Sequence, residues 1–174
     1  DRSAAAFLTA VRHADSKTFR LLERHRGVWE GRYTHLDGRS YAVEEVQIFR
    51  IRVEVFADSD PTYRQTSHYW WADGREQELV YEGSLRGEQL VIDSERMWGE
   101  CRAISADTLY MEYGYKATPA LRIAEMIQLS EAGEQRARTW HWLRAGQLER
   151  ITLVREYRVS DDPASWPLRQ QRPA

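Results

Sequence analysis

The sequence predicts an all-β protein: a single antiparallel up-and-down barrel of about eight to ten strands, with a short helical segment in front of it. Before Gly27 the apolar residues recur at helical spacing, and after it their period changes to two, as in strands. Turn residues separate the strand-like runs that follow. Closing so many sequential strands into a barrel removes the edges that an open sheet would expose.

The helical segment lies between Ala4 and Arg26. Its apolar residues are compatible with one or two short helices, interrupted at Asp15-Ser16, where a side chain could cap a new start. After the barrel the chain is rich in proline and reads as irregular. The predicted division is therefore a helical segment, a barrel domain and an irregular tail: residues 1–26, 27–160 and 161–174.

Ten strand-like runs make up the predicted barrel, and turn-forming residues such as Asp37-Gly38 and Asp73-Gly74 lie between them. A β-sandwich is the alternative all-β fold. A cone-shaped fold of the nuclear-transport-factor type would need more helix than this chain offers. The runs are residues 28–36, 41–57, 62–71, 76–82, 89–93, 95–104, 108–116, 121–130, 135–143 and 147–159.

Gly27-Val28-Trp29 marks the change from helix to strand, and it resembles the Gly-x-Trp signature that opens barrels of the lipocalin-like (calycin) family. In that family an arginine of the last strand packs across the tryptophan, and Arg155 stands at the matching place. Residues 30–33 and 138–142 are similar to uncharacterised bacterial lipocalin-like proteins. The resemblance, from about residue 19 to residue 159, implies a protein that binds small lipophilic molecules; a minority of the family are enzymes.

Composition excludes several classes of partner. The formal net charge is -2, so there is no basic surface for nucleic acid or for an anionic membrane, and no apolar run is long enough to cross a bilayer. Cys101 is the only cysteine, so no intrachain disulfide forms and a cytoplasmic location is expected. Residues 1–10 lack the pattern of a signal peptide, although the sequence leaves open whether a leader was removed. A homodimer is compatible with the sequence.

Motif searches predict neither a metal nor a cofactor. The chain has no Cys-x-x-Cys pair, no His-Glu-x-x-His, no glycine-rich phosphate loop and no Gly-x-Ser-x-Gly elbow. A haem held by one histidine is the remaining alternative, through His141, His68 or His35.

The turns predict a cluster of acid–base residues inside the barrel. Glu125 lies on an otherwise apolar strand face. If residues 131–133 form a three-residue loop, Glu125 stands opposite Thr139, with His141 on the diagonal. A second three-residue loop, at residues 144–146, then places Glu149 across from His141. We expect Glu125, His141 and Glu149 to share one cavity as catalytic groups, whereas a two-residue loop at either turn would bring Trp140 and Trp142 inside.

Aromatic and polar residues on the presumed inner faces are the candidate ligand contacts. The turn at Asp73-Gly74 permits two registers, so the choice between His68 and Tyr69 stays open. The candidate ligand-binding residues are Trp29, Tyr33, His35, Gln65, His68, Tyr69, Tyr113 and Thr139.

Two functions follow from these features. The first is a protein that binds a small, mostly apolar or aromatic molecule in the barrel. The second is a cofactor-free enzyme, an isomerase, cyclase or lyase, that uses the predicted cluster for proton transfer. A structural role without any ligand is a third alternative.

Overall fold

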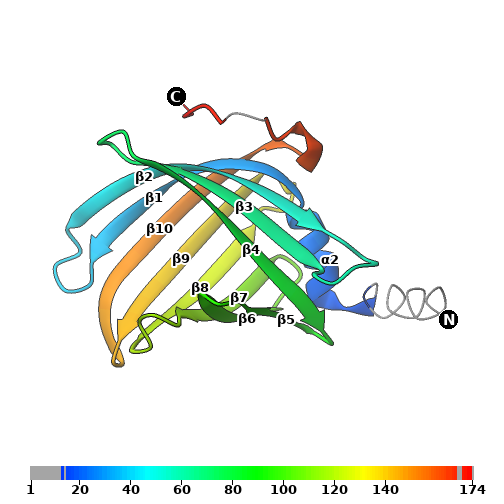
Figure 1. The fold of residues 1–174 in the computed structure, drawn as a ribbon, viewed down its shortest axis with the longest axis horizontal. Coiled ribbons are helices and arrows are strands. Elements are labelled where there is room, and N and C mark those ends of the chain that lie inside the picture. The colour runs from blue at the N-terminus through cyan, green and yellow to red at the C-terminus, as the bar shows by residue number, and fades with distance from the viewer. Residues whose placement is uncertain (1–12, 14, 168–169, 174) are drawn as a thin grey trace.

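The protein is a closed antiparallel barrel of ten strands behind one short helix, as predicted (Figure 1). The computed structural model describes residues 13, 15–167 and 170–173. The strands follow chain order round the barrel, and β10 pairs with β1 to close it. Among these residues no helix has the length and apolar character needed to cross a membrane. The elements are α2 (Lys17–His25), β1 (Gly27–Asp37), β2 (Val43–Val55), β3 (Tyr63–Trp70), β4 (Glu76–Arg86), β5 (Gln89–Asp93), β6 (Met97–Ala103), β7 (Thr108–Tyr115), β8 (Leu121–Leu129), β9 (Gln135–Arg144), β10 (Gln147–Ser160) and a 3-10 turn (Pro163–Ser165).

Helix α2 closes one end of the barrel. Ser16 caps it by accepting a hydrogen bond from the backbone N–H of Phe19 at 3.2 Å, at the interruption that the sequence indicated. Thr18 Oγ1 donates to the carbonyl of Glu88 at 2.7 Å, and Arg24 Nη1 donates to the carbonyl of Ala106 at 2.7 Å, so the helix is tied to two turns at this end. Predictions for residues 1–12 and 14 lie outside the described residues.

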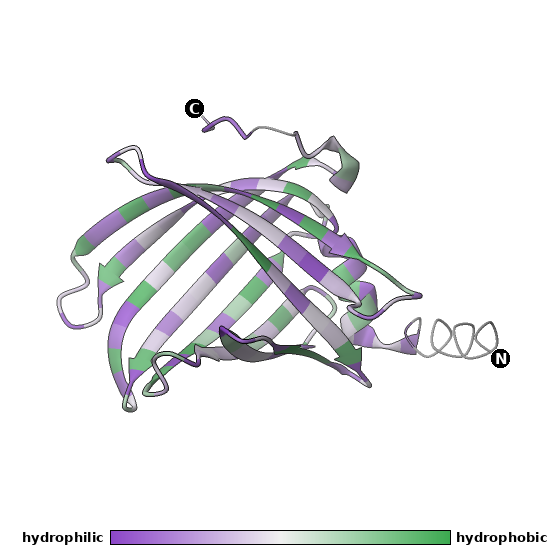
Figure 2. Ribbon diagram, viewed as in Figure 1, coloured by the Kyte–Doolittle hydropathy of each residue, from purple (hydrophilic) through white to green (hydrophobic). Residues whose placement is uncertain are grey.

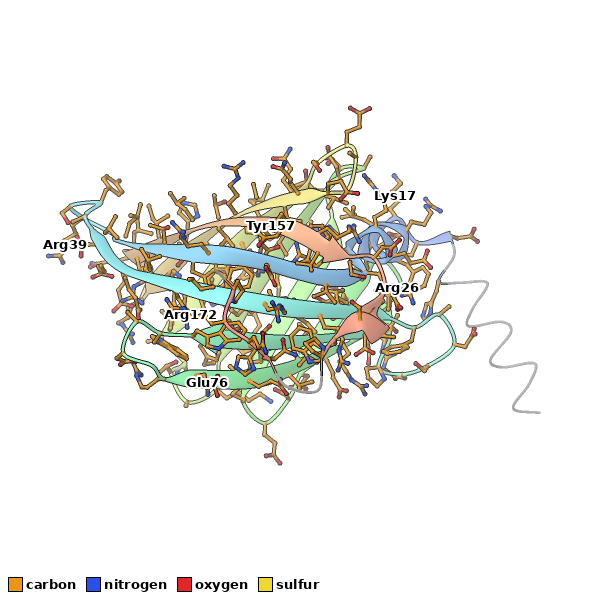
Figure 3. All side chains as sticks on the ribbon, turned by 90° about the horizontal axis from the view of Figure 1, so that it is seen from above. Lys17, Arg26, Arg39, Glu76, Tyr157 and Arg172 are labelled. Carbon is orange, nitrogen blue, oxygen red and sulfur yellow. The ribbon has the colours of Figure 1, made fainter. Side chains whose placement is uncertain are left out.

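The opposite end carries the β1–β2, β3–β4 and β9–β10 turns (Figure 1). Seen from above, Lys17 and Arg26 mark the helix end, and Arg39 and Glu76 lie at the far end (Figure 3). The C-terminal segment lies on the outside of the barrel, where Gln170 accepts a hydrogen bond from Arg50 Nη1 at 3.2 Å. The barrel therefore has one end closed by a helix and one end formed by hairpin turns.

Hydropathy alternates along the strands, as expected where one face lines a core (Figure 2). Phe49, Ile51 and Val53 of β2 all point inward and are fully buried. Gly31 pairs with Phe49, and a Cβ added there would lie 2.8 Å from Cζ of the phenylalanine ring. Glycine is needed at this position because the backbone carbonyl of Arg155, 2.5 Å from such a Cβ, and the ring of Phe49 fill the space that a side chain would occupy.

Trp29 is fully buried near the helix end, and its indole N–H donates to the carbonyl of His25 at 2.8 Å. Two guanidinium groups lie over its ring, that of Arg136 at 4.1 Å and that of Arg158 at 4.4 Å from the centroid. The prediction that Arg155 covers Trp29 is wrong, because Arg155 points outward and is exposed. The last strand does supply an arginine, but it is Arg158.

The predicted register of β8 and β9 is wrong by one residue. The backbone N–H of Ser130 donates to the carbonyl of Gln135, the N–H of Gln135 donates to Oγ of Ser130, and Leu129 pairs with Arg136. The loop between Ser130 and Gln135 therefore has four residues instead of three. A shift of one residue turns every side chain of the following strand to the other face. Glu125 therefore stands opposite Trp140 instead of Thr139.

The β9–β10 turn has two residues, Ala145 and Gly146, both with positive φ. Glu149 is the extra residue of a bulge that follows it, between the Leu143–Leu148 and Trp142–Arg150 pairs. The turn is one residue shorter than predicted and the bulge adds one residue, so the two changes cancel. Residues of β10 after the bulge therefore point to the same side as their partners in β9. The prediction that Glu149 points into the cavity is wrong, because the longer β8–β9 loop reverses β9 and β10 follows it; the inward residues of β10 are Thr152, Val154 and Glu156.

Candidate functional site

A cavity of about 240 Å³ lies inside the barrel. Leu22 of α2 reaches it from the closed end, and Trp71 and Trp142 line it toward the hairpin end. Its wall combines apolar side chains with tyrosines, tryptophans, carboxamides and one ion pair. The lining residues are Leu22, Tyr33, His35, Gln47, Tyr63, Gln65, Tyr69, Trp71, Gln77, Leu79, Tyr81, Leu90, Ile92, Met97, Cys101, Leu109, Met111, Tyr113, Tyr115, Glu125, Ile127, Arg138, Trp140 and Trp142.

The rings of the wall pack on one another. Tyr33 stacks on Phe49 with 4.1 Å between the centroids, and its ring lies 4.8 Å from that of Trp140. The rings of Trp140 and Trp142 are 5.9 Å apart. Such contacts hold aromatic side chains in fixed orientations, so this side of the cavity is shaped before any molecule enters.

A buried ionic network lies between the cavity and the helix end. Arg138 donates through Nε to Glu125 at 2.5 Å and through Nη1 to Glu156 at 3.0 Å. Arg136 forms an ion pair with the other oxygen of Glu156, and its Nη1 donates to Nδ1 of His25 at 3.3 Å. Two carboxylates thus face two guanidinium groups, and only Glu125 and Arg138 reach the cavity wall.

Burial and charge act on the protonation of this network. Burial raises the pKa of Glu125 above its usual value, and the nearby Arg138 and Trp140 oppose the rise. Burial, together with the charge of Arg136, holds the pKa of His25 well below its usual value. His25 is therefore neutral at neutral pH, and the network balances two positive charges against two negative charges.

A smaller polar group lies toward the hairpin end. The fully buried Thr152 accepts a hydrogen bond from the indole N–H of Trp142 at 2.9 Å, and its Oγ1 lies 2.8 Å from Nδ1 of His35. Burial, and then the charge of Arg150, lower the pKa of His35, so its ring is neutral at neutral pH. These contacts fix the orientation of two side chains in the cavity wall.

Trp140 differs from Trp142 in one respect. Its side chain is only 8 % exposed, and it lines the same cavity. Its indole N–H has no hydrogen-bond partner. The indole still lies near enough to Glu125 to help lower the pKa of that carboxyl. Buried N–H groups without a partner are rare in proteins and need an explanation.

The predicted catalytic cluster is not formed. Glu125 lies in the cavity wall, but His141 is exposed on the outer face of β9, and Glu149 is an exposed bulge residue paired with Arg144 at 2.9 Å. The cause is the four-residue loop before β9, which turns Trp140 and Trp142 inward in place of Thr139 and His141.

The candidate ligand contacts divide into two groups. Five of them line the cavity: Tyr33, His35, Gln65, Tyr69 and Tyr113. The other three do not. Trp29 packs below the cavity under its two arginines, His68 points outward and lies 3.2 Å from Glu76, and Thr139 pairs with the exposed Met126 and Leu153.

The sequence did not predict Arg138 in the cavity wall, and it placed Trp140 and Trp142 inside only under the alternative loop length. One signal pointed the other way: a carboxylate on an apolar face, such as Glu125, needs a cation beside it. Arg138 supplies that cation, because the four-residue loop before β9 directs this side chain into the barrel. Among the described residues no group of three or more histidine, cysteine or acidic side chains could hold a metal ion.

Residues 15–161 match the N-terminal domain of unknown function DUF3598. A solved structure of a protein of unknown function from that family, from Nostoc punctiforme, is 14 % identical with a TM-score of 0.60; the match covers 79 % of this chain and 49 % of that one. This chain therefore spans about half the length of the solved family member. No curated protein matches the sequence.

Two further solved structures have the same fold. The S-type phycobiliprotein lyase CPES from Guillardia theta is 13 % identical with a TM-score of 0.61, and the match covers 86 % of this chain and 96 % of that one. Rv2717c from M. tuberculosis is 14 % identical with a TM-score of 0.54, over 80 % of this chain and 95 % of that one. At these identities the likeness concerns the barrel fold alone.

Proposed function

The chain belongs to the DUF3598 family, and from the cavity in its barrel we propose that it binds a small, mostly apolar, aromatic molecule. The observation that carries the proposal is the cavity of about 240 Å³ inside the barrel, whose wall is rich in aromatic rings. Pockets for drug-sized ligands measure ~300–1,000 Å³, so the ligand of this smaller cavity should be smaller than a drug-sized molecule.

The chemistry of the wall supports binding more than catalysis. Rings such as Tyr33, Trp140 and Trp142 offer flat apolar surface, and the surface of the wall is mostly apolar although glutamines, tyrosine hydroxyls and one ion pair also line it. Burial raises the pKa of Cys101 to about 12, so this thiol is not a nucleophile at neutral pH. Of the three residues that the acid–base alternative offered for proton transfer, Glu125 lies in the cavity wall, and His141 and Glu149 do not.

The names of the fold neighbours identify no ligand for this chain. One of them is a phycobiliprotein lyase by name, so this barrel fold also occurs in a protein named as a lyase. The DUF3598 protein from Nostoc punctiforme is described as having unknown function.

Titration with N-phenyl-1-naphthylamine, a neutral aromatic dye that brightens on leaving water, tests the proposal. Leu79 lines the cavity, while its neighbour Val80 points outward and is 51 % exposed. Leu79→Trp places an indole in space that the dye would occupy and should weaken binding on the order of tenfold, equivalent to about 1.4 kcal/mol. The control Val80→Trp adds the same ring to the outside of the same strand and should leave the affinity unchanged. The absence of dye binding, or equal effects of the two variants, would contradict the proposal.

A further inference from the structure

Two buried hydroxyl groups in the cavity wall lack a partner. Tyr33 and Tyr113 line the cavity and are 2 % and 6 % exposed, yet neither hydroxyl forms a hydrogen bond with the described residues. Polar atoms that are both unpartnered and closed off from solvent occur elsewhere, for example in His25 and Trp140, and these hydroxyls are not among them. Both hydroxyls therefore lie open on the inner surface of the cavity. Polar groups without a partner in a buried site need an explanation.

The guanidinium group of Arg138 adds a third open group. It donates to Glu125 through Nε and to Glu156 through Nη1, and its remaining nitrogen, Nη2, has no partner among the described residues. The side chain is 8 % exposed and lines the cavity, and Nη2 is not one of the atoms closed off from solvent. Nη2 therefore offers N–H groups to a molecule in the cavity, and an arginine nitrogen can only donate.

These three groups lie close together. Tyr33 and Arg138 occupy one inward row of the barrel, with a single strand between them. Both contact the indole of Trp140, since the ring of the tyrosine lies 4.8 Å and Cζ of the arginine 5.1 Å from its centroid. Tyr113 of β7 is the diagonal cross-strand neighbour of Glu125. Burial raises the pKa of both tyrosine hydroxyls, and the charges of the nearby ion pair act on both. The two hydroxyls are therefore neutral, and each can donate and accept a hydrogen bond.

Resting on the proposed binding function, we propose that the ligand class is neutral phenols, whose hydroxyl group accepts a hydrogen bond from Nη2 of Arg138 and shares hydrogen bonds with the hydroxyls of Tyr33 and Tyr113. A hydroxyl can accept and donate at once, whereas a carbonyl or ether oxygen can only accept. A carboxylate is disfavoured, because Arg138 already faces the carboxylates of Glu125 and Glu156, which would repel a third. The aromatic part of the ligand packs against the rings of the wall.

Four neutral naphthalenes, each substituted at position two, test this hydroxyl. Naphthol and methylnaphthalene have the same number of non-hydrogen atoms, and so do methoxynaphthalene and ethylnaphthalene. Each compound is titrated at pH 7 by displacement of N-phenyl-1-naphthylamine or by calorimetry. We expect naphthol to bind about tenfold more tightly than methylnaphthalene, equivalent to about 1.4 kcal/mol. The methoxy compound should gain less over the ethyl compound, because its oxygen accepts a hydrogen bond but cannot donate one.

Conservative variants assign the preference to the two open hydroxyls. Tyr33→Phe and Tyr113→Phe each remove one oxygen and keep the ring, so the ratio between the affinities for naphthol and methylnaphthalene should fall about threefold or more in each. Tyr63→Phe is the control, because Tyr63 lines the same cavity but its hydroxyl already donates to Gln65 at 2.9 Å. This variant should leave the ratio near tenfold. If a variant does not fold, the ratio in the wild-type protein still decides the ligand class.

The outcomes distinguish this inference from the binding function on which it rests. If none of the four compounds binds and the dye does not bind, the proposed function fails. If naphthol and methylnaphthalene bind equally well to the wild-type protein, the function stands and the phenol class is overturned. Equal gains for the hydroxyl and methoxy groups overturn the donated hydrogen bond. A ratio that falls as far in Tyr63→Phe as in Tyr33→Phe and Tyr113→Phe overturns the assignment to the two open hydroxyls.

Discussion

Trp29 lies under two guanidinium groups at the closed end, and its ring is fully buried. Trp29→Ala should lower the free energy of unfolding by about 3–5 kcal/mol, since it removes a large core ring and leaves a cavity. Arg155→Ala is the control, because this exposed arginine does not reach the ring, and its effect should stay within ~0.5 kcal/mol. Urea unfolding followed by fluorescence or circular dichroism measures both. An equal loss of stability in the two variants would contradict the assignment of Trp29 as a core residue of the closed end.

Arg138 joins two buried carboxylates, so its loss would leave charges without a partner. Arg138→Met should lower the free energy of unfolding by about 3–5 kcal/mol, because Glu125 and Glu156 would remain buried and the second would keep only Arg136. Arg144→Met removes an arginine from an exposed pair with Glu149 and should have much less effect. Chemical denaturation at pH 7 compares the two. A small effect of Arg138→Met would mean that water solvates the network.

At the scale of strands, the alternation of residues predicted the number and order of the elements. The ten runs read from the sequence correspond to β1–β10, because each run ends at residues whose backbone preferences favour turns. Inward residues of the first strand, such as Tyr33 and His35, were also predicted, since only apolar alternation decided their facing.

The facing of β9 could not be predicted from polarity. Arg136 and Arg138 alternate with small and polar residues, which is typical of a strand with its arginines in solvent. In the barrel they point inward because Glu125 and Glu156, distant in sequence, neutralise them there. Loop length at residues 131–134 decides the register, and both three and four residues are compatible with a glycine-containing hairpin. The one-residue difference in this loop is what places Thr139 and His141 on the outer face of β9, and Glu149 outside the cavity with them.

The β9–β10 turn contains a strained residue. Ala145 has φ +49°, a left-handed conformation that costs residues with a Cβ roughly 1–2 kcal/mol. Asparagine is favoured at this position of a two-residue turn, so Ala145→Asn should raise the free energy of unfolding by about 0.5–1 kcal/mol. Ala132→Asn, in the β8–β9 loop, is the control, because Ala132 is not among the residues with positive φ. Thermal unfolding should show a higher Tm for the first variant alone.

For the molecule as a whole, polarity is distributed along the axis of the barrel. Trp29 and the ionic network lie next to α2, which they contact through His25, and aromatic rings such as Trp71 and Trp142 lie farther along the barrel. Hairpin turns form the other end (Figure 1). A closed barrel has no free edge, so the seam between β1 and β10 is hydrogen-bonded like any other pair. A molecule entering from the hairpin end would therefore meet apolar rings before it meets Glu125 and Arg138.

His25 couples the helix to this network, and acid should weaken the whole barrel through it. Its pKa is held well below the usual 6.5 by burial and by the charges of Arg136, Arg138 and Arg158. Between that lowered pKa and 6.5 the unfolded chain binds a proton that the folded protein does not, so stability falls as pH falls below 6.5, by at most ~1.4 kcal/mol per pH unit. His25→Gln keeps an acceptor for Arg136 but has no titrating group. The free energy of unfolding of the wild type minus that of His25→Gln should therefore decrease steadily from pH 7 to about pH 5. A constant difference, measured by urea denaturation at each pH, would show that His25 does not titrate between the folded and unfolded states.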